Sequence, residues 1–227
     1  MRYDQPAERN VCQDAKIMTI RIDLYTDIVC PWCLIGTKRL DNVLQSQFSQ
    51  IDVDIVHHPV LLHPDCPPEG ISIADLLTAK FGQFDPKTLF ARPEAEARTV
   101  GIALNLAKQP PLYPTTPGHT LIRLARPLGT QHRLSMALGS AYFLDQRNIS
   151  DLEVLADVAS RHGFSREQAR LLASSPAEIA GTRREATASA EKGVKTVPHL
   201  LVNGVLTSCQ DEASIAAALQ LAMTATA

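Results

Sequence analysis

The chain has 227 residues, of which 45% are hydrophobic and 20% are charged, and its formal net charge is −2. This balance is ordinary for a globular protein, and it gives no support for nucleic acid or an anionic membrane as a partner. Five cysteines are too few for a disulfide framework in a chain of this length, and their odd number leaves at least one thiol unpaired. The composition leaves the oligomeric state open between a monomer and a homodimer.

The first eighteen residues are polar and lack the apolar stretch of roughly 7–15 residues that a secretory signal contains. No run approaches the roughly 18 apolar residues of a membrane span. We therefore expect a cytoplasmic protein; a secreted form whose signal has been removed is the alternative. Because Met18 would be a natural start, residues 1–17 are expected to form a loose extension.

The letters VCPWC at residues 29–33 place two cysteines three positions apart, between two patterned segments. Residues 20–25 alternate apolar with polar side chains, which is typical of a half-buried strand. After the motif, apolar residues recur at helical spacing to about Gln47, so a helix is expected there. Pro31 suits the first position of this helix, which makes Cys30 the N-cap. Two cysteines where a strand passes into a helix indicate a redox-active dithiol rather than half of a zinc site.

Disulfide exchange requires a thiolate, and an ordinary cysteine, with a pKa near about 8.5, is mostly protonated at neutral pH. The N–H groups at a helix N-terminus carry a partial positive charge that favours an anion. We therefore predict that Cys30 is the nucleophile and that Cys33, about one turn further, is the resolving thiol. Pro31 and Trp32, the only tryptophan, are expected to tune the reduction potential. The alternative is a pair of inert core cysteines.

A second strand is expected at residues 51–56, which alternate strictly, so that strand, helix and strand form a βαβ unit with parallel strands. A proline-rich loop at 64–70 follows, and residues 71–193 carry helical patterns. Residues 102–115 contain three prolines and are expected to be a loop that passes the site. The expected N-caps are Asp85 and Thr116 before prolines, and Ser150, Ser165 and Ser175 in capping boxes with Glu153, Gln168 and Glu178; Gly163 is an expected helix C-cap.

The end of the chain returns to strand patterns. Asn203-Gly204 stands between two short apolar runs, 199–202 and 205–207, which is the strongest short signal for a β-hairpin. A final helix is expected from Asp211 to about Met223. The order of elements is therefore strand, helix and strand, then helices, then a hairpin and a helix.

Together these segments resemble the DsbA-like branch of the thioredoxin superfamily. The resemblance covers about residues 19–222, and it implies an α/β protein in which a thioredoxin fold at 18–65 and 194–227 is interrupted by an all-helical insertion at 66–193. It also implies a disulfide oxidoreductase or isomerase that exchanges disulfides with protein or small thiols. Within this branch the chain is similar to the FrnE-like cytosolic dithiol oxidoreductases, in the segments DIVCPWCLIGTKRL, PDCPPEG, YPTTPGHTLIRLA, SDLEVLADVA and VPHLLVNG.

The resemblance also implies roles for residues far from the motif. It implies that the Val197–Pro198 peptide bond is cis and lies against the dithiol. His119 matches a histidine that is usual in this family, and it is a candidate for substrate contact or proton transfer, although a structural histidine is the alternative. Ser208 and Gln210 are further candidates for substrate contact. The chain departs from the family at Cys209, a candidate accessory thiol, and Cys12 and Cys66 also lie outside the motif.

Several histidines invite a metal-site interpretation. His57 and His58 are adjacent on the expected strand edge, so their side chains point to opposite faces. His63 and Cys66 could supply two ligands, but no second pair completes a tetrahedral set, and no metal is expected. No cofactor is expected beyond the redox-active disulfide, with glutathione as a candidate co-substrate.

Two other functions remain as alternatives. One is a glutathione-dependent isomerase or transferase of the hydroxychromene carboxylate isomerase type. Those enzymes typically carry serine where Cys30 stands, so the two cysteines argue against this function. The other is a zinc-binding or chaperone-like module, which metal analysis of the purified protein would distinguish from an oxidoreductase.

Overall fold

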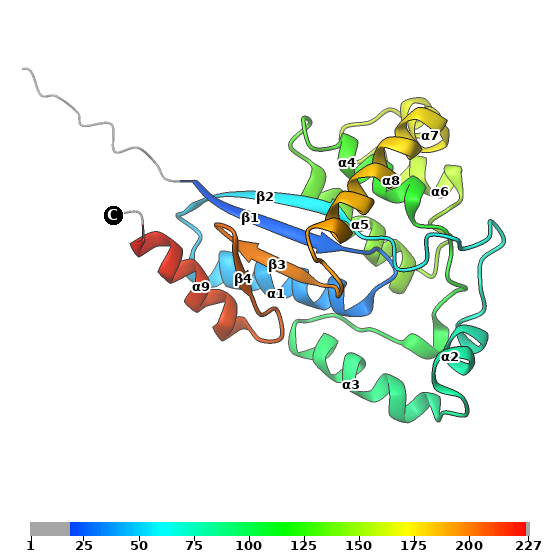
Figure 1. Cartoon of the computed structure of the whole chain (residues 1–227), viewed down its shortest axis with the longest axis horizontal. Coiled ribbons are helices and arrows are strands. Elements are labelled where there is room, and N and C mark those ends of the chain that lie inside the picture. The colour runs from blue at the N-terminus through cyan, green and yellow to red at the C-terminus, as the bar shows by residue number, and fades with distance from the viewer. Residues whose placement is uncertain (1–18, 226–227) are drawn as a thin grey trace, which may run out of the picture.

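The computed structural model of the protein describes residues 19–225. Figure 1 shows a sheet with helices α2–α7 gathered at one end, whereas the first and last described residues lie at the other end. The elements are β1 (Thr19–Thr26), α1 (Pro31–Gln47), β2 (Asp52–Pro59), α2 (Ile73–Phe81), α3 (Pro86–Thr99), the 3₁₀ helix η1 (Leu106–Lys108), α4 (Thr116–Leu124), α5 (Gln131–Phe143), α6 (Leu152–Ala159), α7 (Arg166–Ser174), α8 (Pro176–Glu191), β3 (His199–Val202), β4 (Val205–Thr207) and α9 (Glu212–Thr224).

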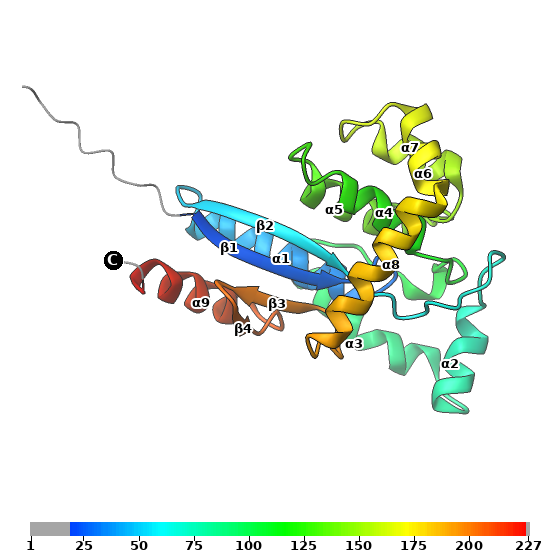
Figure 2. The ribbon, with the colours of Figure 1, turned by 45° about the horizontal axis from the view of Figure 1, so that its top comes forward.

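The sheet has the strand order β2-β1-β3-β4. Strands β1 and β2 are parallel, as the βαβ pattern predicts, whereas β3 pairs antiparallel with both β1 and β4. Asn203 and Gly204 connect β3 to β4 with φ angles of 47° and 81°. Both residues are thus left-handed, which is the backbone of a type I′ turn and confirms the predicted hairpin. Figure 2 shows α8 crossing the sheet on the side opposite α1.

Two hydrophobic cores build the molecule. The first lies between the sheet and the helices α1 and α9, and joins side chains such as Ile22, Leu40 and Leu219. The second lies among the insertion helices, around residues such as Leu121 and Tyr142. Residues on both sides of the CPWC motif belong to this second core, namely Ile28, Val29, Leu34 and Ile35. The dithiol therefore lies where the two cores meet.

Most expected helix starts are confirmed, and two are corrected. Asp85, Ser165 and Ser175 accept backbone N–H groups as N-caps, and Ser165 forms the full capping box with Gln168. Thr115, not Thr116, is the N-cap of α4, and Asp151, not Ser150, is the N-cap of α6. Strand β2 extends three residues beyond Val56, because its pairing with β1 continues to Pro59. Gly163 is not the predicted C-cap of α6, because the helix ends at Ala159. It lies in the turn that follows, with a φ of 95°.

The correction at α6 has a measurable consequence. Asp151 accepts the N–H of Glu153 at 2.8 Å, whereas the Ser150 hydroxyl donates to Asn148 at 2.7 Å. Asp151→Ala should therefore lower the free energy of unfolding by about 1 kcal/mol, because an orphan N–H loses its acceptor. Ser150→Ala is the matched control and should cost less. Urea denaturation measures both, and an equal or reversed order would contradict this assignment.

Candidate active site

Cys30 is the N-cap of α1, with extended φ and ψ angles of −95° and 113°, as the sequence predicts. Its pKa is lowered, chiefly by a hydrogen bond from the Cys33 thiol and further by the backbone N–H groups of Cys33 and Trp32, which together outweigh burial. These donors exist because the first turn of a helix leaves its N–H groups without intrahelical acceptors. These interactions therefore favour the thiolate form of Cys30.

Cys33 has the opposite character. Its residue is 4% exposed, and burial, with the neighbouring Cys30, raises the pKa of its thiol well above the ordinary value. The two pKa shifts have opposite directions, so Cys30 ionises more readily than Cys33. This division gives one nucleophile and one proton donor, which is what a two-step exchange of disulfides requires.

The Val197–Pro198 peptide bond is cis, as the resemblance implies. The Cys30 Sγ lies 4.0 Å from the Val197 carbonyl oxygen, so the two motifs, 167 positions apart in the chain, form one site. Gly36 permits this approach, because a Cβ there would lie 3.2 Å from the Pro198 Cγ and 3.1 Å from the Cys209 Cβ. Gly36 can be read from the sequence, but the two residues that pack against it cannot.

A groove of about 680 Å³ opens beside the dithiol. Cys209 lies in its wall, but burial raises the pKa of this thiol to about 11, which disfavours it as a nucleophile. We call this space the dithiol groove; its lining includes Trp32, Val197 and Pro198 and the candidate contacts Ser208 and Gln210, but neither Cys30 nor Cys33.

His119 does not reach this groove. It is 3% exposed, and its Nε2 lies 3.1 Å from a carboxylate oxygen of Asp27, whose other oxygen accepts the N–H of Leu62 at 2.8 Å. A second cavity, of about 20 Å³, is lined by Asp27, Cys33 and Thr37. Asp27, which His119 contacts, therefore lies beside Cys33 in the interior rather than in the dithiol groove. Asp27 is not among the candidate residues predicted from the sequence, although its charge just before an apolar VCPWC motif was the available signal.

The remaining candidate residues lie apart from the dithiol or its groove. Cys66 contacts the Leu112 carbonyl oxygen at 3.3 Å within the insertion, and Cys12 lies outside the described residues. His57 bonds to His132 at 2.9 Å, whereas His58 bonds to Asp23 at 2.6 Å. Within residues 19–225, no three or more His, Cys, Asp or Glu side chains are grouped to hold a metal ion. In the same range, no helix is both long and apolar enough to span a bilayer.

The sequence profile of the DsbA-like thioredoxin domain matches residues 21–220. The chain belongs to the DsbA-like thioredoxin family. A crystal structure of a probable DsbA oxidoreductase from Streptomyces coelicolor is similar, with a TM-score of 0.80, 26% identity and 90% of each chain covered. The chain is also 25% identical to YwbO of Bacillus subtilis over 65% of its own length and 68% of that protein's length.

A more distant structure has the same DsbA-like fold. It is a putative protein disulfide isomerase from Nitrosomonas europaea, with a TM-score of 0.68, 16% identity, and coverage of 92% of this chain and all (100%) of the other. The predicted fold class, a thioredoxin-like α/β fold with a helical insertion, is confirmed. The DsbA-like family is one of thiol–disulfide oxidoreductases, and the chain carries a CXXC pair, Cys30 and Cys33, within the matched range.

Proposed function

We propose that this DsbA-like protein is a FrnE-type dithiol oxidoreductase that exchanges disulfides through Cys30 and Cys33. The observation that carries this proposal is the opposite shift of the two thiol pKa values, down for Cys30 and up for Cys33. Two cysteines with a purely structural role would not require opposite shifts of their pKa values. The approach of the Cys30 Sγ to the cis Val197–Pro198 segment adds a backbone against which a substrate can lie.

The exchange proceeds in two steps. The Cys30 thiolate attacks a substrate disulfide, forms a mixed disulfide and releases one substrate thiolate. Cys33 then attacks the Cys30 sulfur, which forms the Cys30–Cys33 disulfide, releases the second substrate thiolate and frees the Cys33 proton. A base must accept this proton, because Cys33 is fully buried and its pKa is raised.

Asp27 is the base that we assign to this step. Its carboxylate acts electrostatically on both cysteines and shares the 20 Å³ cavity with Cys33. That volume is enough for about one water molecule, through which the proton can pass. The His119 Nε2–H donates to the same carboxylate, and we propose that it positions Asp27 rather than contacting the substrate.

The reduction potential of the dithiol, measured against glutathione buffers, tests this function and gives its direction. We expect a reversible two-electron transition at Cys30–Cys33, shown by peptide mapping, and catalytic reduction of insulin. Tight glutathione binding with turnover that leaves the dithiol unchanged would favour the hydroxychromene carboxylate isomerase type instead. A stoichiometric zinc ion on these thiols would favour the metal-binding module.

A further inference from the structure

The charge of the dithiol groove differs in sign from that of the whole chain. The chain has a net charge of −2, yet the groove lining includes Arg39 and Arg92 and, within the described residues, neither Asp nor Glu. The two arginines do not contribute equally. Arg39 is 4% exposed, forms an ion pair with Glu96 and donates to the Cys209 carbonyl oxygen at 3.1 Å, so its charge is largely compensated.

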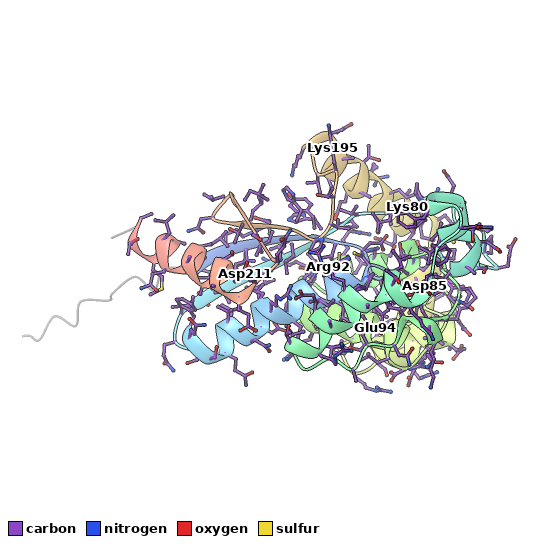
Figure 3. The ribbon with its side chains drawn as sticks, turned by 90° about the horizontal axis from the view of Figure 1, so that it is seen from below. Lys80, Asp85, Arg92, Glu94, Lys195 and Asp211 are labelled. Atoms are coloured by element: carbon purple, nitrogen blue, oxygen red, sulfur yellow. The ribbon has the colours of Figure 1, made fainter. Side chains whose placement is uncertain are left out.

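Arg92 is different, because it is exposed and has no compensating carboxylate. Its guanidinium carbon lies 5.4 Å from the centre of the Trp32 ring, and it makes no hydrogen bond or ion pair with any residue from 19 to 225. Figure 3 shows Arg92 on α3, a helix of the insertion. A guanidinium stacked on an aromatic face keeps its N–H groups available at its edges. Arg92 is therefore an exposed cation whose N–H donors are not used by any residue from 19 to 225.

The position of this cation relates it to the reacting sulfur atoms. Arg92 faces the ring of Trp32, which stands between Cys30 and Cys33 in the first turn of α1, and both Arg92 and Trp32 line the groove. The groove reaches the reacting sulfur through Val197, which also lines it and whose carbonyl oxygen lies 4.0 Å from the Cys30 Sγ. Glutathione, a low-molecular-weight thiol derived from cysteine, carries two carboxylates, so its disulfide presents anionic groups to such a cation. The volume of the groove, about 680 Å³, also lies in the range of roughly 300–1,000 Å³ that is typical of small-molecule sites.

We propose that the dithiol groove selects disulfides of small, carboxylate-bearing thiols, and that Arg92 is the residue that determines this preference. The proposal rests on the disulfide-exchange function above. The substrate carboxylate pairs with Arg92, while Ser208 and Gln210, which also line the groove, offer neutral hydrogen-bonding groups. An acidic segment of a protein substrate is the competing occupant.

The test compares two disulfides as oxidants of the reduced protein, with Trp32 fluorescence as the readout, because it is the only tryptophan. Glutathione disulfide is anionic and bis(2-hydroxyethyl) disulfide is neutral. Arg92→Gln should lower the rate constant for glutathione disulfide about fivefold and leave the neutral disulfide within about twofold. Arg98→Gln, which removes the same charge from the exposed end of α3, is the matched control and should change neither rate. Higher salt should reduce the wild-type preference.

Each outcome decides the proposal. Equal slowing of both disulfides would show that Arg92 merely supports Trp32, and no change with either would remove it from substrate recognition; both results overturn the proposal and leave the exchange function standing. If Arg92→Gln slows only the reduction of insulin-type protein disulfides, the groove serves proteins instead. If neither disulfide oxidises the wild-type dithiol, the proposed function itself fails, and the selectivity fails with it.

Discussion

Replacing Cys30 with serine is expected to lower the rate of insulin reduction by at least about a thousandfold, to the uncatalysed background. The lowered pKa of Cys30 makes its sulfur the thiolate of the pair, and a serine hydroxyl at the same N-cap cannot attack a disulfide. Cys33 cannot substitute for it, because burial holds that thiol protonated. Turbidity of the released insulin B chain measures the rate, and retention of full activity would contradict the mechanism.

Cys66→Ser is the control for this variant. Burial raises the pKa of Cys66, and its sulfur contacts the Leu112 carbonyl oxygen inside the insertion, so its loss should leave the rate unchanged. Alkylation by iodoacetamide gives a second measurement. Cys30 should react before the other thiols at neutral pH, and its rate should fall only as the pH falls through a pKa that lies below the ordinary cysteine value.

The sequence alone predicted the parts of this site that depend on local rules. Pro31 at the first helical position makes Cys30 the N-cap, and Asn203-Gly204 supplies the left-handed turn of the hairpin. Where two neighbouring residues could cap the same helix, the choice failed: Asp151 rather than Ser150 caps α6, because the Ser150 hydroxyl bonds to Asn148 instead.

Contacts between residues that are far apart in the sequence could not be predicted from these local rules. The Asp27–His119 pair joins residues 92 positions apart, and nothing in the local sequence of either one shows the other. Arg92 on Trp32 is a similar case, since it depends on how α3 packs beside α1. The resemblance supplied the cis Val197–Pro198 bond, whereas periodicity and spacing would have favoured an ordinary trans proline.

Replacing Asp27 with asparagine should slow the resolution step by Cys33 and, in contrast, make Cys30 easier to ionise. These two effects together distinguish a base from a carboxylate with a structural role only. The resolution of a mixed disulfide by Cys33 should slow about a hundredfold near neutral pH, because the amide cannot accept the Cys33 proton. The deficit should shrink as the pH rises and hydroxide takes that proton instead. At the same time the alkylation profile of Cys30 should move to lower pH, because the Asp27 charge, which raises the pKa of Cys30, is gone.

Asp41→Asn is the matched control for this pair of measurements. Its carboxylate also lies against a histidine, with 2.7 Å between its oxygen and the Nε2 of His132, but it does not line the cavity beside Cys33. This variant should change neither the rate of resolution nor the alkylation profile. Quenched-flow trapping of the mixed disulfide measures the first quantity. If Asp27→Asn shifts the Cys30 profile yet leaves resolution unchanged, Asp27 acts on the dithiol through its charge alone, and the Cys33 proton leaves by another route.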